Sequence, residues 1–277
     1  MGADEVFNAK WNSGKRQTFT LGNRCIRLPG LLSFAAVSVL TREDIELSAA
    51  QDFYELLRLL PGVDLVRSGG PGGQVSVFIR GSNSNHVLVL IDGVRAASSN
   101  TGAYAWEQIP LNQVERVEVV RGPRASVYGS DAIGGVIQIF TRGQAAPYAR
   151  VTAGSYDSFS AEGGIGYEGE ASRISLNAGY RGVGGFSAQN ENGFSYDPDD
   201  DGFETTNLGI KGATTMGSHR WTYSLLALES ETEFDQGVSD VSQSFGALGF
   251  EGRLSDDWAY QLVAGYASED LESDFGF

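Results

Sequence analysis

Two patterns of hydrophobic and polar positions divide the chain, and the first runs from residue 37 to residue 146. The apolar run Val37–Leu40 predicts a short strand, and Thr41 with the acidic residues after it predicts the start of a helix. In 52–60, apolar side chains recur at helical spacing until Pro61 ends the run. Short β-branched runs separated by glycine-rich loops then predict strands at 75–81, 86–93, 114–122 and 134–141. This segment is predicted to be a compact α+β domain with a small sheet.

The second pattern begins after residue 147 and consists of longer strands with period-two alternation. Small and apolar residues occupy every second position, with aromatic residues towards the ends, in 159–167, 174–180, 221–227 and 258–266. Strands of about ten residues with this alternation are typical of a transmembrane β-barrel. A soluble β-sandwich produces a similar pattern, so periodicity alone favours the barrel without excluding the sandwich.

The number of expected strands sets a further limit on the second segment. We expect roughly seven strands after residue 147, whereas a membrane barrel needs about 8 to close and about 22 to enclose a folded domain. An open sheet would expose two unpaired edges to lipid, where each unsatisfied amide is costly. The sequence therefore predicts an incomplete barrel, and hence a fragment.

The formal charge of −15 is unevenly distributed along the chain. Residues 1–150 hold 15 Lys and Arg against 13 Asp and Glu, a net of +2, and residues 151–277 hold 5 against 22, a net of −17. A chain this acidic repels phosphate backbones, which argues against a nucleic-acid partner. The single cysteine, Cys25, excludes an internal disulfide. No apolar stretch is long enough for a membrane helix, and residues 24–36 only faintly resemble the remainder of an export signal.

Residue types that carry catalysis are sparse. His86 is expected in an apolar strand and His219 at the start of another, so the two histidines lack metal-ligand spacing. Cys25 has no base near it in sequence, and neither a G-K-[ST] phosphate loop nor a G-x-S-x-G elbow occurs. An enzyme is therefore the weakest interpretation.

Three stretches carry a resemblance to a known family. LPGVDL at 60–65, FIRGSNSNHVLVLIDGVR at 78–95 and VERVEVVRGPRASVYGSDAIGGVIQIFT at 114–141 resemble the plug of TonB-dependent outer-membrane receptors, and are nearest to the cobalamin receptors of that family. The resemblance implies a plug domain at 37–146, the first strands of a transmembrane β-barrel at 147–277, and a disordered or remnant segment at 1–36. The implied fold class is an α+β plug domain followed by antiparallel transmembrane β-barrel strands.

The same resemblance implies energised import across the bacterial outer membrane. A ligand too large for a porin, cobalamin or a ferric siderophore, would bind to plug apices and outer loops, and a TonB-type inner-membrane partner would then pull on an N-terminal box. No such box is recognisable before Val37. Outer-membrane lipid is the remaining implied partner. A siderophore receptor and a soluble secreted β-rich binding protein stay open as alternatives to a cobalamin receptor.

The resemblance also implies where the plug would contact its ligand. Residues 96–106 are irregular and rich in small hydrogen-bonding side chains, as in a loop that binds a polar ligand, although a plain solvated loop would look alike. Position by position, the family pattern implies substrate contacts at Gln74, Ser76, Asn83, Asn100 and Thr101.

Acidic loops in the second segment suggest a calcium site. YDPDDDGF at 196–203 places hard oxygen ligands at short spacing beside a turn-forming glycine, but a solvated acidic turn explains the same residues equally well. The family resemblance adds EFDQGVSD at 233–240. Together the two loops imply calcium ligands at Asp197, Asp199, Asp201, Phe234, Asp235 and Asp240. Two positions depart from the family pattern, because Ser187 stands in place of an Asp and Phe234 in place of a Tyr.

Three arginines of the predicted plug, Arg80, Arg121 and Arg124, lie next to or near glycines in the sequence. An unpaired buried charge is costly, and guanidinium groups pair bidentately with carboxylates. We therefore expect these arginines to bind carboxylates on the inner barrel wall. The alternative is that they are ordinary surface charges.

Overall fold

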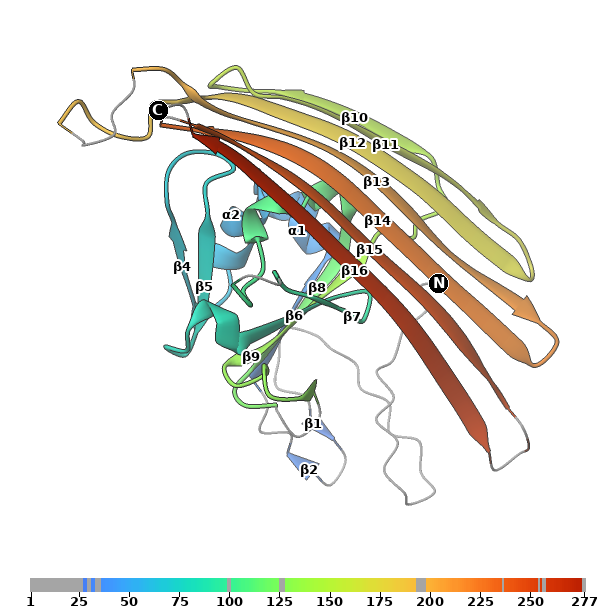
Figure 1. The fold of residues 1–277 in the computed structure, drawn as a ribbon. Helices are drawn as coiled ribbons and strands as arrows, with labels where there is room; N and C mark the ends of the chain where they lie inside the picture. The colour runs from blue at the N-terminus through green and yellow to red at the C-terminus, as the bar shows by residue number, and fades with distance from the viewer. Residues whose placement is uncertain are drawn as a thin grey trace.

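The computed structural model describes residues 27–28, 31–32, 36–98, 101–124, 128–192, 198–235, 237–253, 255 and 258–275. Within them, a small α+β domain packs against one face of a long, curved antiparallel sheet (Figure 1). We call this sheet the wall. The wall begins at residue 148, close to the predicted boundary between the two segments.

The N-terminal domain is built on a five-stranded sheet in the order β3-β8-β9-β6-β7, in which only the β6–β9 pair is parallel. The strands of this sheet are β3 (Ala36–Thr41), β6 (Val87–Ile91), β7 (Val94–Ala96), β8 (Val114–Arg121) and β9 (Gly135–Thr141). A separate hairpin consists of β4 (Val63–Arg67) and β5 (Val75–Ile79), and β1 (Arg27–Leu28) pairs with β2 (Leu31–Leu32). The helical elements are α1 (Arg42–Ser48), α2 (Phe53–Arg58), η1 (Ser84–His86), η2 (Trp106–Gln108) and η3 (Leu111–Gln113).

Both predicted helices begin at capping residues. The Thr41 hydroxyl accepts a hydrogen bond from the Asp44 backbone N–H, and the Asp44 carboxylate accepts one from the Thr41 backbone N–H, which completes a capping box at α1. Asp52 caps α2 by accepting from the Glu55 backbone N–H at 2.8 Å. The predicted strand before Thr41 and both helices are thereby confirmed.

Two predicted strands are shorter in the structure because left-handed backbone conformations end them. Arg80 (φ 53°) and Gly81 (φ 77°) turn the chain after β5, and Asp92 (φ 47°) and Gly93 (φ 85°) turn it after β6. His86 lies in η1, before β6, so its predicted place in an apolar strand was wrong. The short strands β4 and β7 were not predicted, although each is the partner of a predicted strand.

The core of the N-terminal domain lies between α2, the β4–β5 hairpin and the central sheet. Phe53, Leu57 and Trp106 are fully or almost fully buried there, and Trp106 stacks against Phe53 with ring centroids 6.1 Å apart. Leu226 and Phe245 of the wall belong to the same buried cluster. The domain and the wall thus share one hydrophobic core.

The wall consists of seven antiparallel strands in sequential order. They are β10 (Tyr148–Ala153), β11 (Phe159–Glu168), β12 (Ser172–Phe186), β13 (Asp201–Met216), β14 (His219–Phe234), β15 (Gly237–Arg253) and β16 (Ala259–Phe275). The long connection between β12 and β13 lies at what we call the loop end of the wall, and the short β13–β14 connection lies at the opposite, turn end (Figure 1). The predicted number of strands is confirmed.

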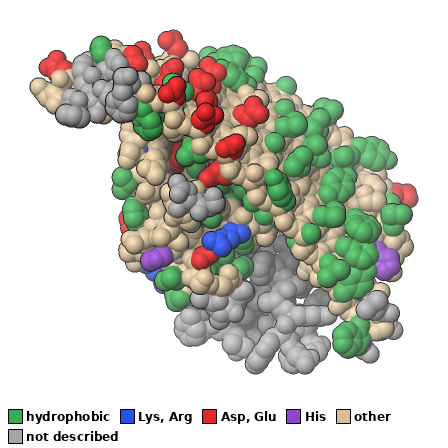
Figure 2. Space-filling view, viewed as in Figure 1, with side chains coloured by type: hydrophobic (Ala, Val, Ile, Leu, Met, Phe, Trp, Pro, Cys, Tyr) green, Lys and Arg blue, Asp and Glu red, His purple; other side chains and the backbone are tan. Residues whose placement is uncertain are grey.

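Side chains of the wall alternate between two faces, as the sequence predicted. On β14, Leu226 and Leu228 are buried against the N-terminal domain at 4% and 2% exposure, whereas Trp221 and Leu225 point away from it at 38% and 42%. Beyond Ala227 the outward positions become Glu229, Glu231 and Glu233. Figure 2 accordingly shows hydrophobic side chains towards the turn end and acidic side chains towards the loop end of the wall.

In the part of the chain that the structure describes, no helix combines the length and the apolar character needed to cross a membrane. The fold is an α+β domain followed by antiparallel strands of an incomplete barrel, which confirms the predicted fold class.

Candidate binding site

The N-terminal domain is fixed to the wall by a buried polar contact at η3. Asn112 and Gln113 both donate hydrogen bonds to Asn207 Oδ1 on β13, at 2.8 and 2.7 Å, and Gln113 Nε2 also donates to the Asn177 carbonyl oxygen on β12 at 3.1 Å. Glycines make the space: a Cβ at Gly179 would lie 2.4 Å from Asn112 Nδ2, and one at Gly209 would lie 2.1 Å from Gln113 Oε1. This contact joins η3 to β12 and β13 of the wall.

Ion pairs add to this attachment with charges opposite to the expected ones. Lys211 of the wall binds Asp92 of the domain at 2.7 Å and donates to the Thr141 carbonyl oxygen. Arg150 of the wall lies 3.6 Å from Glu46 on α1 and 3.4 Å from Glu162 on β11. The wall therefore supplies the cation in both ion pairs that join the two units.

The prediction that three plug arginines bind wall carboxylates is not met among the described residues. The Arg121 guanidinium donates to the Ser38 hydroxyl at 2.7 Å, and the Arg124 guanidinium donates to the Pro123 carbonyl oxygen at 3.5 Å. Arg80 has no ion pair and lies close to Arg121, where burial, followed by the Arg80 charge, lowers the pKa of Arg121.

The first group of predicted ligand residues lies on the β4–β5 hairpin. Gln74 is exposed in its connecting loop, where its carbonyl oxygen accepts from the Ser68 backbone N–H at 3.0 Å, and Ser76 is half-buried at the start of β5. The loop touches the loop end of the wall: Gly70 lies against the Asp201 carbonyl oxygen, and Gly72 lies so close to Phe203 that a Cβ there would be 2.3 Å from its ring. The loop that carries Gln74 therefore lies next to β13 at the loop end of the wall.

The second group lies at the opposite end of β5. Asn83 is exposed just before η1, and Thr101 is exposed in a tight turn closed by the Gly102 N–H to Ser98 O bond of 2.9 Å. Gly102 packs against Asn85, so these two loops are neighbours. Asn100 lies outside the described residues. The structure thus places the five predicted contacts in two groups, one at each end of one short strand.

The irregular segment 96–106 is only partly a loop that could bind ligand. Tyr104 and Trp106 are buried and meet edge to face with ring centroids 5.5 Å apart. Burial raises the pKa of the Tyr104 phenol, which stays neutral and donates to Gln243 Oε1 of the wall at 3.4 Å. The expectation of a ligand loop fails for these two aromatic residues, because their side chains complete the shared core.

The predicted calcium residues are divided between two places. Asp201 is 3% exposed and accepts from the Ala188 backbone N–H at 2.6 Å, and the charges of Asp235, Asp199 and Glu233 act on it. Glu233, which sequence reasoning did not include, also accepts from the Gly202 backbone N–H at 3.1 Å. Asp197 lies outside the described residues.

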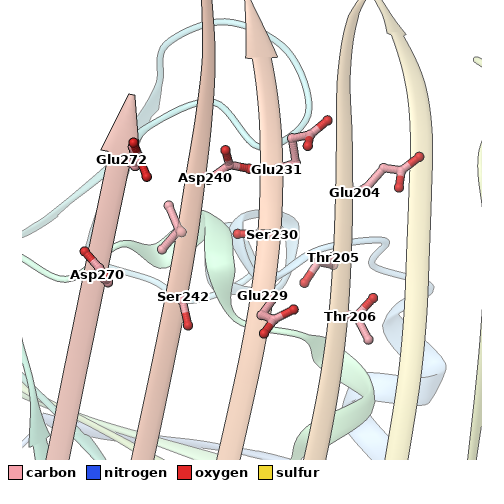
Figure 3. Close-up of a pocket in the computed structure, with 11 residues that line it drawn as sticks. Glu204, Thr205, Thr206, Glu229, Ser230, Glu231, Asp240, Ser242, Asp270 and Glu272 are labelled. Atoms are coloured by element: carbon pink, nitrogen blue, oxygen red, sulfur yellow. The ribbon is translucent and has the colours of Figure 1, made fainter. Parts of the chain in front are cut away.

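Asp240 lies elsewhere, on the outward face of the wall. It stands in register with acidic residues on the neighbouring strands, and Figure 3 shows four of these carboxylates at about one level: Glu204, Glu231, Asp240 and Glu272. Asp201, in contrast, points inward and is 3% exposed. Phe234 is half-buried and packs against Phe275 at 5.8 Å. Among the described side chains, no three His, Cys, Asp or Glu converge tightly enough to hold a metal ion.

Comparison with known proteins identifies the N-terminal domain. Residues 33–136 match the family model described as the TonB-dependent Receptor Plug Domain. Residues 33–136 are therefore similar to the plug domain of the TonB-dependent receptors. The plug resemblance found in the sequence is confirmed by this match.

Curated relatives match both the plug and the wall. The chain is 40% identical over 248 residues to the vitamin B12 transporter BtuB of Photobacterium profundum, which covers 87% of the chain and 39% of that relative. It is 34% identical over 242 residues to BtuB of Vibrio cholerae (strain O395), covering 86% of the chain and 38% of the relative. The chain therefore spans about two fifths of the length of these relatives.

Solved structures show the same fold at lower identity. The ferric yersiniabactin uptake receptor FyuA of Yersinia pestis has a TM-score of 0.71 at 18% identity, over 88% of the chain and 42% of that protein. The siderophore receptor PirA of Pseudomonas aeruginosa has a TM-score of 0.62 at 24% identity, over 86% and 41%. The packing of the plug against the first strands is thus a property of the fold.

Proposed function

We propose that this chain is the plug and first barrel strands of an outer-membrane receptor for the energised uptake of cobalamin. The observation that carries the proposal is the 40% identity to a vitamin B12 transporter, which extends through plug and wall in one match of 248 residues. Siderophore receptors share the fold at 24% identity or less. The apolar outward face of the wall supports a place in the bacterial outer membrane rather than a soluble binding protein.

Binding followed by import accounts for the chemistry that the chain presents. The plug offers uncharged hydrogen-bonding side chains, Gln74, Ser76, Asn83 and Thr101, which suit a bulky polar ligand. A TonB-type inner-membrane partner would supply the work that moves the plug. On this proposal, the chain binds its ligand and responds to the TonB-type partner without catalysing a reaction.

Calcium is proposed as a structural ion at the loop end of the wall. Asp199, Asp201 and Asp235 place like charges near one another there, and a bound cation would relieve their repulsion by drawing them together. Asp240 is left out of this set because it faces outward. Phe234 could offer only its carbonyl oxygen.

A chimera tests the function. Residues 36–275 replace the matching segment of the Photobacterium vitamin B12 transporter, and correct assembly is checked by heat-modifiable mobility on gels. We expect calcium-dependent binding of cyanocobalamin, weakened about tenfold by Gln74→Ala together with Asn83→Ala. Tight binding of a ferric siderophore without affinity for cyanocobalamin would reject cobalamin as the ligand. Equal cobalamin affinity with calcium and with a chelator would reject the calcium site alone.

A further inference from the structure

A cavity of about 350 Å³ separates the plug from the first four strands of the wall. Its plug side is formed by α1, the turn at 49–52 and the segment 107–112, and its wall side by β10, β11, β12 and β13. A volume of this size lies in the range of small-molecule sites. The cavity includes none of the five predicted ligand residues, so it is a separate space.

Most charged groups around this cavity already have partners. Glu46 binds Arg42 at 2.9 Å, and Arg150 stands between Glu46 and Glu162. Asp52 is paired with Arg67. Glu107 accepts a hydrogen bond from the Val75 backbone N–H at 3.0 Å.

Arg181 is the exception among the described residues that line the cavity. Its guanidinium group makes no hydrogen bond and no ion pair within 4.0 Å in the described part of the chain, and its nearest aromatic contact is the Phe203 ring at 5.9 Å. The charges of Asp52, Glu55 and Arg67 influence the Arg181 guanidinium only through space, without direct contact. Arg181 is half-buried, and a cation held inside the fold without a partner is costly to keep, which suggests that a ligand supplies the partner.

A hydroxyl group lies next to this guanidinium. Thr205 on β13 is the cross-strand neighbour of Arg181 in the inward-facing register, and Thr205 also lines the cavity. Thr205 is 5% exposed, and its buried hydroxyl has no hydrogen-bond partner among the described residues. Ser160 on β11 continues the same row on the other side of Arg181. The row therefore presents one guanidinium fork flanked by two hydroxyl groups.

We propose that Arg181 and Thr205 form a binding site for a phosphate group inside the cavity. A guanidinium can donate two parallel hydrogen bonds to two oxygens of one phosphate, and a hydroxyl can donate to a third. A metal cation is excluded by the positive charge of Arg181, and an apolar ligand would leave both polar groups without partners. The phosphate site does not depend on which ligand the five predicted ligand residues of the plug bind.

The test uses the full chain in detergent micelles and inorganic phosphate as the probe. Saturable binding is expected in a titration followed by ³¹P NMR line width. Arg181→Gln should weaken it at least tenfold, and Arg181→Lys, which keeps the charge but loses the fork, should weaken it less. Arg173→Gln is the matched control, because it removes the same charge from the same face of β12 about 26 Å away. The affinity of Arg173→Gln for inorganic phosphate should stay within about twofold of that of the unchanged chain.

Thr205→Val keeps the proposal testable if Arg181 variants fold poorly. The change removes a hydroxyl that has no partner in the fold, so the melting temperature should not fall, while phosphate binding should weaken severalfold. Dimethyl phosphate distinguishes two sources of the same chemistry: binding comparable to that of inorganic phosphate assigns the site to an organic phosphodiester, and binding of inorganic phosphate alone assigns it to the free ion. The proposal is overturned if neither probe binds, or if Arg173→Gln loses as much affinity as Arg181→Gln.

Discussion

Glu107 is a carboxylic acid in the plug that contacts the β4–β5 hairpin at Val75. Burial raises the pKa of Glu107 to about 7. The negative charge of Glu269 on the wall also raises this pKa, whereas the hydrogen bonds that Glu107 accepts and the positive charge of Arg67 lower it. The ordinary value is 4.5. Between these two values the folded chain holds more protons than the unfolded chain, so this residue makes stability fall as the pH rises through that window.

Glu107→Gln should therefore stabilise the chain at pH 8 and have little effect near pH 4.5. The amide oxygen can still accept from the Val75 backbone N–H, while the cost of burying a charge disappears. We expect a gain of about 1–3 kcal/mol at pH 8, measured by thermal melting in detergent at both pH values. Glu43→Gln, an exposed change on α1, provides the control. Equal effects of the two substitutions at pH 8 would contradict the assignment.

Single residues show how far local sequence information reaches. The cap Thr41 could be recognised because its partner lies three residues along the chain. Tyr104 and Trp106 could not be assigned to the core, because their partners are Phe53 and wall residues far away in sequence. Arg181 carried no local signal either, since only the fold reveals that it has no partner.

The short element η3 fixes the plug to the wall. Its side chains Asn112 and Gln113 occupy the space that a side chain at Gly179 or Gly209 of the wall would otherwise fill. Asn112 and Gln113 are almost fully buried, and both depend on the Asn207 amide oxygen. Moving either side chain would break a hydrogen bond in a place that water does not reach. The attachment is therefore sensitive to the size of two wall residues, Gly179 and Gly209.

Gly179→Ala and Gly209→Ala should each loosen the attachment by about 1–3 kcal/mol, through overpacking and lost hydrogen bonds. The measurement is hydrogen exchange of the backbone amides in 111–121, which should become faster in both variants. Gly246→Ala serves as the matched control, because a Cβ there would meet its nearest atom only at 3.9 Å. Unchanged exchange in the first two variants would show that η3 is not the anchor.

Elements of the wall were predictable from sequence, but their contacts were not. Period-two alternation gave the strands and their outward residues, because each face meets one kind of environment along its length. The ligand and calcium residues came from family resemblance instead. The structure separates Asp240 from Asp201 by placing them on opposite faces of the sheet, a distinction that follows from strand register and that loop composition does not contain.

At the scale of the whole molecule, the two faces of the wall have different roles. The inward face is divided between apolar contacts with the plug and polar groups lining a cavity, and the outward face changes from apolar to acidic towards the loop end. Among the described residues, only the apolar part of the inward face is covered by protein, namely by the plug. The outward apolar rows require another apolar neighbour, and under the proposed function the lipid of a bilayer would provide one.

Two arginine substitutions on the same outward row of β14 test this orientation. Leu225→Arg places a charge among Ile210, Gly246 and Tyr266, and should destabilise the membrane-inserted wall by about 2–4 kcal/mol if these residues face lipid. Glu231→Arg places the same side chain beside Glu204 and Asp240, where it exchanges repulsion for attraction and should cost nothing. Urea unfolding from lipid vesicles measures both. Since the two sites lie six residues apart on one face of one strand, equal tolerance of the two arginines would mean that the apolar rows do not lie in the bilayer.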